Sequence, residues 1–325
     1  MSKVAENKTE VSMSKVAENK TEVSIDIFTE DNVASAESKR TEFVRLGIFI
    51  CLAFAISWIP AVVLKHTVGF SEWYATNKMP VLTWPLLFGP ALANLLTRLV
   101  TKEGPRDNKL GLNLKGNVRC YVLAFFLATL INAANALFVT AVYGNGDMSK
   151  SLLGFPLKDL LPITLLGYVQ APLMLFITFG EEFGFRAYMV PKMQKLFGRL
   201  PAYALGGIIW GLWHTVLIAE GCYFGKDYPG FPYTGILLMC GICTVIGVFL
   251  AWLTERTNSV WPACIMLAMY RFAPNTIESF LTRGVDPDFS PTIGQQAVAL
   301  IPSAIVAVVV IAMTKRKTQS NKKPR

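Results

Sequence analysis

The sequence predicts an all-α membrane protein that crosses the bilayer several times. Of its 325 residues, 53% are hydrophobic and 16% are charged, and the mean hydropathy is +0.42. A chain this apolar is not an ordinary soluble domain. Its apolar residues fall into runs of roughly 20, the length that a helix needs to cross a bilayer core. Lys and Arg residues cluster beside these runs, so the net charge of +9 indicates an anionic membrane lipid surface as the partner, not a nucleic acid.

The N-terminal segment precedes all of the apolar runs. The sequence MSKVAENKTEVS occupies residues 1–12 and is repeated without change at 13–24. This perfect repeat indicates a recent duplication or an uncertain start codon, Met1 or Met13, and not a solenoid. Residues 1–40 are polar, charged and nearly free of aromatic side chains, so we expect a disordered N-terminal tail.

We expect a transmembrane domain of about eight helices over residues 41–313, followed by a basic cytoplasmic tail at 314–325. Pro60 is expected to kink the first helix, and the seventh apolar run is short for a membrane span. The predicted spans are 46–64, 79–96, 120–143, 160–179, 202–218, 234–253, 260–272 and 297–313.

The loops predict the orientation of this multi-pass protein. The segments after the second, fourth, sixth and eighth spans carry Lys or Arg, whereas the alternate loops carry few basic residues. By the positive-inside rule, both termini are then cytoplasmic. An endomembrane such as the endoplasmic reticulum and a bacterial inner membrane fit this pattern equally well.

An acidic motif closes the fourth span. Glu181, Glu182 and Arg186 follow the apolar run 160–179, and charged side chains at membrane depth are costly enough to indicate a function. On a helix, Glu182 and Arg186 are four residues apart and can pair. Glu181 points about 100° away from that pair, so we expect it to be the carboxylate that is left to react.

A histidine motif lies in the fifth span. Gly207 and Gly211 form a pair of small residues that lets another helix approach closely. His214 and Trp210 fall near the same face, so the histidine is expected at a helix–helix contact. The chain has two histidines, and the other, His66, ends the first span on the opposite side of the membrane. Asn94, Asn132 and Asn135 are expected to form hydrogen bonds between helices.

Together these motifs resemble the CAAX protease and bacteriocin-processing family of intramembrane endopeptidases, also called the Abi family. The family's Glu-Glu-x-x-x-Arg motif is matched by Glu181, Glu182 and Arg186, and its usual Phe-x-x-x-His motif is present as Trp210-x-x-x-His214. The resemblance implies about eight helices around a cavity open to the cytoplasm and the lipid. It implies cleavage of a prenylated peptide, in which Glu181 activates water, His214 positions that water, and Glu182 and Arg186 brace the site.

The family's third motif, His-x-x-x-Asn, is altered in this chain. Aligned on the Trp-Pro-Ala sequence at 261–263, Leu267 stands at the histidine position and Arg271 at the asparagine position. A shifted alignment supplies Asn275 but no histidine. Losing an oxyanion donor costs ~10²–10³ in rate, although Arg271 is itself a charged donor. Catalytic zinc takes about three protein ligands and Glu182 is engaged with Arg186, so we expect no metal and no other cofactor.

Three functional hypotheses remain at this stage. The first is a CAAX-type intramembrane endopeptidase, a hydrolase that uses Glu181 as its base. The second is a pseudoprotease that binds an apolar peptide or a membrane partner without cutting it. The third is an enzyme acting on a small isoprenoid or terpenoid, with Glu181 as general acid or base in the same cavity. The side chains expected to line that cavity are Gln170, Phe185, Trp210, Trp213 and Tyr270.

Overall fold

A computed structural model describes residues 37–67, 69, 80–143, 174–272 and 292–320. These residues form helices joined by turns, and no strand occurs among them, which confirms the predicted all-α polytopic membrane fold. Within the described ranges, four helical segments are long and apolar enough to cross a membrane: Glu37–Thr67, Val118–Tyr143, Tyr233–Thr257 and Ile293–Thr314. The total of eight spans stays a prediction.

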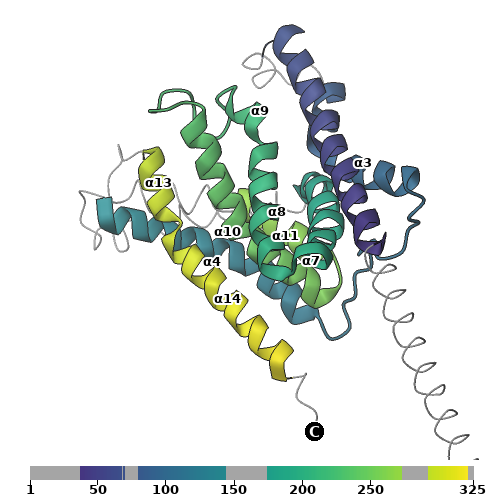
Figure 1. Cartoon of the computed structure of the whole chain (residues 1–325). Coiled ribbons are helices and arrows are strands. Elements are labelled where there is room, and N and C mark those ends of the chain that lie inside the picture. The colour runs from purple at the N-terminus through teal and green to yellow at the C-terminus, as the bar shows by residue number, and fades with distance from the viewer. Residues whose placement is uncertain (1–36, 68, 70–79, 144–173, 273–291, 321–325) are drawn as a thin grey trace, which may run out of the picture. The chain divides into compact units, whose positions relative to one another are not determined.

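The described helices follow the predicted apolar runs closely. An unlabelled helix covers Glu37–Thr67 and another covers 174–184. The remaining elements (Figure 1) are α3 (Pro80–Val100), α4 (Val118–Tyr143), the π-helix η1 (Phe185–Met189), α7 (Val190–Phe197), α8 (Arg199–Trp213), α9 (Thr215–Ile218), α10 (Tyr233–Thr257), α11 (Trp261–Phe272), α13 (Ile293–Ala299) and α14 (Ile301–Ser320).

Several predicted segments differ from the structure or lie outside it. The predicted span 202–218 is interrupted, because α8 ends at Trp213 and the short helix α9 begins after a turn at His214. Most of the predicted span 160–179 lies outside the described residues, as do residues 1–36 of the predicted tail and residues 321–325.

Two glycines bring the helix with the acidic motif against α3. A Cβ atom on Gly184 would lie 2.4 Å from the carbonyl oxygen of Pro90, and one on Gly180 would lie 2.6 Å from that of Leu87. Across the same contact, Asn94 donates a hydrogen bond of 2.8 Å to the carbonyl oxygen of Phe183. This close packing places the buried carboxylates beside α3.

The predicted close contact of small residues in the fifth span is confirmed. A Cβ atom on Gly207 would lie 2.3 Å from the Cα atom of Thr244, and one on Gly211 would lie 2.5 Å from that of Cys240. Both partners belong to α10, which packs along α8 and also contacts α11 and α14. The close approach of α8 to α10 positions the C-terminal end of α8, where Trp210 and His214 lie.

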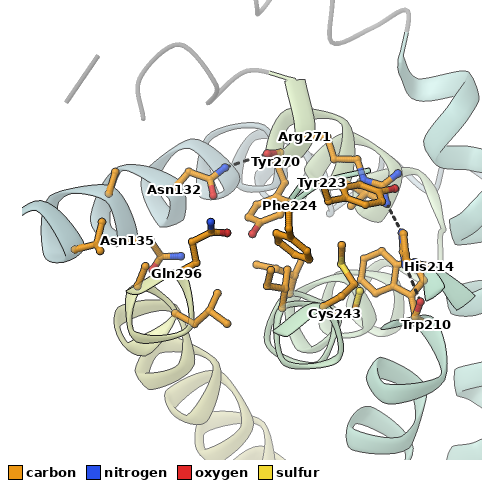
Figure 2. Close-up of a pocket in the computed structure, with 18 residues that line it drawn as sticks. Asn132, Asn135, Trp210, His214, Tyr223, Phe224, Cys243, Tyr270, Arg271 and Gln296 are labelled. Carbon is orange, nitrogen blue, oxygen red and sulfur yellow. Dashed lines mark hydrogen bonds between the residues drawn. The ribbon is translucent and has the colours of Figure 1, made fainter. Parts of the chain in front are cut away.

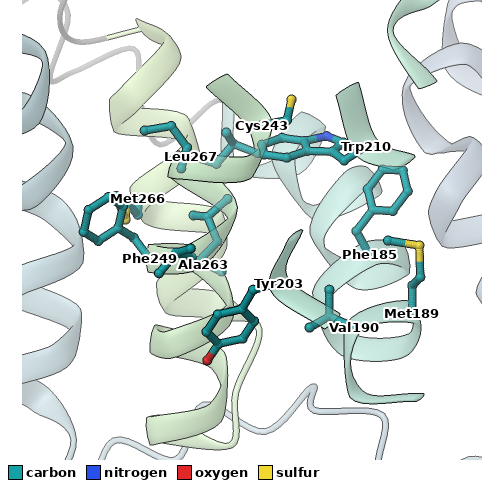
Figure 3. Close-up of a cluster of buried hydrophobic side chains, with 14 of the residues drawn as sticks. Phe185, Met189, Val190, Tyr203, Trp210, Cys243, Phe249, Ala263, Met266 and Leu267 are labelled. Carbon is teal, nitrogen blue, oxygen red and sulfur yellow. The ribbon is translucent and has the colours of Figure 1, made fainter. Parts of the chain in front are cut away.

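The part of the hydrophobic core that lies beside the motif is formed by η1, α7, α8, α10 and α11 (Figure 3). Phe185 and Met189 of η1 and Phe249 of α10 are at most 1% exposed. Met266 and Leu267 of α11 are buried in the same cluster. The charged residues of the motif, Glu181, Glu182 and Arg186, are at most 2% exposed, so packing encloses them and solvent does not.

Candidate active site

The buried ion pair Glu182–Arg186 is present as the spacing predicts. Arg186 Nη1 donates to Glu182 Oε1 over 2.9 Å, and the two side chains are 2% and 0% exposed. The Arg186 guanidinium also lies 3.8 Å from the centroid of the Trp210 ring, a cation–π contact. Gly247 on α10 leaves room for it, since a Cβ atom there would lie 3.3 Å from Arg186 Nη2. The pair therefore braces the motif helix against α8 and α10.

Glu181 is not the unpaired carboxylate that the sequence predicts. Arg271 donates to both of its oxygens, to Oε1 through Nη1 and to Oε2 through Nη2, the latter over 2.9 Å. Trp210 Nε1 also donates to Oε2, over 2.9 Å. The prediction failed because helix spacing reveals partners within one helix, whereas Arg271 comes from α11. In Glu182, by contrast, Oε2 has no hydrogen-bond partner within the described ranges.

His214 connects the end of α8 to this cluster. Its Nδ1 lies 2.8 Å from the carbonyl oxygen of Trp210, and because a carbonyl can only accept, Nδ1 is the protonated nitrogen. The other nitrogen, Nε2, then has a free lone pair and lies 3.3 Å from Arg271 Nη2. The side chain is 1% exposed. His214 thus presents an acceptor to the same cation that holds Glu181.

A cavity of about 290 Å³ opens beside these residues. Arg271, His214 and Tyr223 lie at one end of it, and Asn132, Asn135 and Gln296 lie at the other, as Figure 2 shows. Aromatic and aliphatic side chains form the wall between the two ends. Glu181 does not line the cavity; its carboxylate lies behind Arg271 and Trp210. A ligand in this space therefore meets Arg271 before it reaches the carboxylate.

The residues expected to line the cavity divide into three groups. Trp210 and Tyr270 lie on its wall. Phe185 and Trp213 do not, which corrects the expectation for them: their rings pack edge to face, with centroids 5.8 Å apart, inside the hydrophobic core. Gln170 lies outside the described residues.

The altered third motif lies at the cavity in its first alignment. Leu267 lines the cavity and is 1% exposed, and Arg271 lies one helical turn further along α11. Asn275, which the shifted alignment would use, lies outside the described residues. The side chain that substitutes for the family's asparagine is therefore in contact with the acidic motif.

Two features of the site do not follow from the sequence motifs. Tyr223 and Phe224 belong to none of the motifs, yet both line the cavity, and the Tyr223 ring centroid lies 5.5 Å from that of His214. The interhelical asparagines also contribute to the cavity: Asn132 donates to the carbonyl oxygen of Tyr270 over 3.0 Å, and Asn135 lines the same space. An excess of polar residues in the third span was the available signal.

The residues of the site do not fit a divalent metal ion. A guanidinium occupies the position between Glu181 and His214 where a cation would be held, and Glu182 is paired with Arg186. Among the described residues, no group of three His, Cys, Asp or Glu side chains is arranged to hold a metal ion. With Leu267 in place of a histidine, the donors fall short of the roughly three that catalytic zinc requires.

The fold and the site define a membrane-embedded helical protein with a buried cluster of carboxylate, imidazole and guanidinium groups. Comparison with known proteins agrees with this description. A family model described as type II CAAX prenyl endopeptidase Rce1-like matches residues 160–273, the segment that contains Glu181, His214 and Arg271. A curated relative, CAAX prenyl protease 2 of Methanococcus maripaludis, is 24% identical over 231 residues, covering 70% of this chain and 80% of the relative.

These matches confirm the resemblance to the CAAX protease and Abi family. The chain is thus similar to the CAAX-type intramembrane proteases, and its long apolar helices make it an integral membrane protein.

Proposed function

We propose that this protein is an intramembrane endopeptidase that cleaves near the C terminus of a prenylated peptide, with Glu181 as its general base and without a metal ion. The observation that carries the proposal is that Arg271, which lines the cavity beside His214, contacts both Glu181 and His214. A base, a hydrogen-bond acceptor for water and a charged donor are the groups that peptide hydrolysis requires.

The proposed reaction uses these three side chains in turn. Arg271 leaves Glu181 and donates to the carbonyl oxygen of the scissile peptide bond. A water molecule, held by His214 Nε2 and Glu181, loses a proton to Glu181 as its oxygen bonds to the carbonyl carbon. The carbon–nitrogen bond then breaks, and the proton passes from Glu181 to the departing amine. The products are a new C-terminal carboxylate and a short peptide with a free amino group.

Arg271 is able to make this movement. It is the penultimate residue of α11, which ends at Phe272, and its side chain is 21% exposed, against 1% for Glu181. It also lines the cavity in which a substrate would lie. Arg271 therefore has space to turn from the carboxylate toward a bound carbonyl group, while Glu181 and His214 stay in place.

The test is cleavage of a farnesylated CAAX peptide by the purified full chain in detergent or nanodiscs, with mass-spectrometric detection of the released peptide. Glu181→Gln keeps one acceptor oxygen, which can still accept from Arg271 Nη2 and Trp210 Nε1, but it replaces the other oxygen with an NH2 donor. Because the variant removes the base, we expect a loss of ~10²–10⁴ in kcat. The matched control is Glu220→Gln, since Glu220 is paired with Lys65 and does not line the cavity. Equal rates for the two variants would contradict the proposal.

One observation favours a protein that binds without cutting. Both oxygens of Glu181 are engaged, and the position of the family's second histidine holds Leu267. A pseudoprotease would bind the farnesylated peptide with similar affinity in wild type and in Glu181→Gln, and neither would release a product. Peptide binding measured beside cleavage separates this function from the proposed one.

A second observation favours an isoprenoid substrate. Trp210, Tyr223, Phe224 and Tyr270 give the cavity an aromatic wall, and aromatic faces stabilise cations. Turnover of free prenyl diphosphates, lost in Glu181→Gln and without any peptide cleavage, would establish this function in place of the protease. We place both termini in the cytoplasm, as the basic loops indicate, in an endomembrane or a bacterial inner membrane.

A further inference from the structure

A second cavity lies away from Glu181, among α4, α10 and α14. We call this cavity the three-helix groove; its volume is about 780 Å³. Two of the residues that line it are basic, Arg119 and Arg256. The large apolar side chains that line it are Leu123, Trp252, Val310 and Met313.

The two arginines mark one end of the groove. Arg119 is the second residue of α4, and Arg256 lies in the last turn of α10. Both are exposed, and neither forms an ion pair with an acidic side chain in the described part of the chain. Two positive charges on one groove repel each other, so this end favours an anion.

The apolar side chains lie one helical turn further into the bundle. Leu123 follows Arg119 by four residues on α4, and Trp252 precedes Arg256 by four residues on α10, a spacing that puts each pair on one helix face. Val310 and Met313 of α14 complete the wall. The groove thus has charged side chains at the helix ends and apolar side chains one turn further along the helices. This arrangement matches a ligand with a charged headgroup and an apolar chain.

We propose that the three-helix groove binds an anionic phospholipid. The phosphate would lie against Arg119 and Arg256, whose planar guanidinium groups match phosphate oxygens. One acyl chain would run along Leu123, Val310 and Met313. Tryptophan is enriched at the depth of lipid headgroups, which is where Trp252 would lie in such a complex.

The chemistry of the groove favours this occupant over a segment of the chain itself. The residues after Met313 include Lys315, Arg316 and Lys317, which carry the same sign of charge as the groove and would not neutralise it. They add to the positive potential that attracts anionic lipid. The proposal does not depend on the chemistry at Glu181, because the groove shares no lining residue with the catalytic cavity.

The test uses the full chain in a neutral detergent, titrated with phosphatidylglycerol or phosphatidylcholine brominated on the acyl chains. Bromine quenches nearby tryptophan, and we expect the anionic lipid to quench at a lower concentration than the zwitterionic lipid. The chain has seven tryptophans, so Trp252→Phe serves to locate the signal. In that variant the quenching specific to the anionic lipid should disappear.

Substitutions then test the phosphate contact. Arg119→Gln and Arg256→Gln should each weaken binding of the anionic lipid by about fivefold, since one basic residue near an anionic lipid contributes ~1 kcal/mol. Lys195→Gln is the matched control, because Lys195 is exposed on α7 and does not line the groove. Soluble glycerol phosphate distinguishes a lipid from a free phosphate and should not compete at the lipid's binding concentration.

Each alternative result would overturn the proposal. Equal quenching by the two lipids in wild type would show that the groove does not select an anionic headgroup. Equal losses in Arg119→Gln, Arg256→Gln and Lys195→Gln would reduce the effect to net charge. Displacement of the lipid by glycerol phosphate would assign the groove to a soluble phosphate compound.

Discussion

Arg271 Nη2 lies 2.9 Å from Glu181 Oε2 and 3.3 Å from His214 Nε2. One guanidinium group on α11 therefore contacts both residues that the motifs assign to the chemistry. In the family's motif this position is an asparagine, which could contact a substrate but would leave the carboxylate without a cationic partner. The ion pair of Arg271 with Glu181 can therefore be tested by changing Arg271 alone or together with Leu267.

Replacing Arg271 separates its two proposed roles. Arg271→Asn keeps a donor for the oxyanion and releases Glu181, so we expect cleavage to be retained or faster. Arg271→Leu removes the donor, and kcat should fall by ~10²–10³. Both variants leave a buried carboxylate without its cation and should be less stable, by roughly 3–5 kcal/mol. Steady-state kinetics beside thermal unfolding would show the split; equal losses of kcat in the two variants would mean that Arg271 is no oxyanion donor.

Restoring the family motif should speed the reaction. Leu267 and Arg271 are one turn apart on α11 and line the same cavity, so Leu267→His combined with Arg271→Asn rebuilds His-x-x-x-Asn in place. We expect kcat/KM to rise by ~10-fold or more over wild type, because a second donor then faces the oxyanion. Leu267→His alone is the control, since it places an imidazole beside a guanidinium that still holds Glu181. A double variant no faster than wild type would show that the motif is not limiting.

The close contact between α8 and α10 should tolerate no added methyl group. Gly207→Ala would bring a Cβ atom to 2.3 Å from the Cα atom of Thr244, and separating the two helices should cost about 1–3 kcal/mol. Gly241→Ala on α10 is the matched control, because its Cβ atom would lie 3.8 Å from Leu300 and helix propensity favours alanine by roughly 0.5–1 kcal/mol. Thermal unfolding in detergent measures both. Similar melting temperatures for the two variants would contradict this packing.

Glu103 ties the end of α3 to the motif helix and should make stability depend on pH. Lys192 donates to its Oε1 over 2.7 Å and Tyr188 to its Oε2 over 2.9 Å. Burial alone would raise the pKa of the Glu103 carboxyl, but the hydrogen bonds from Lys192 and Tyr188 outweigh it and hold the pKa below its usual 4.5. The folded state therefore favours the charged form, so its contribution is present above pH 4.5 and is lost as the pH falls through the lowered pKa.

Glu103→Gln tests this directly. The variant should be less stable than wild type by about 1–3 kcal/mol at neutral pH, and the difference should shrink as the solution is acidified below the usual pKa of the carboxyl. Unfolding curves of both proteins across this pH range provide the measurement. A difference that stays constant down to the most acidic condition would show that the charge of Glu103 is not the source.

Much of this molecule follows from local sequence patterns. The apolar runs predict the helices because a helix in lipid must satisfy its own backbone hydrogen bonds and needs a fixed length to cross the bilayer. The pairing of Glu182 with Arg186 and the close contact at Gly207 and Gly211 follow from the 3.6-residue period of one helix. The break at His214 is different, since nothing in the apolar run between Ala202 and Ile218 signals a turn.

The sequence by itself determined the membrane class, the family resemblance and the partners that lie within one turn of each other. Only the tertiary structure decided which carboxylate is held, because Glu181 and Arg271 are 90 residues apart and their contact depends on how α11 packs against the motif helix. The tertiary structure also decided which residues line the cavity. In its wall, Tyr223 and Phe224 come from a turn and lie beside residues of α4, α10, α11 and α13. Spacing along a helix fixes which side chains share a face, but the packing of helices decides what that face meets.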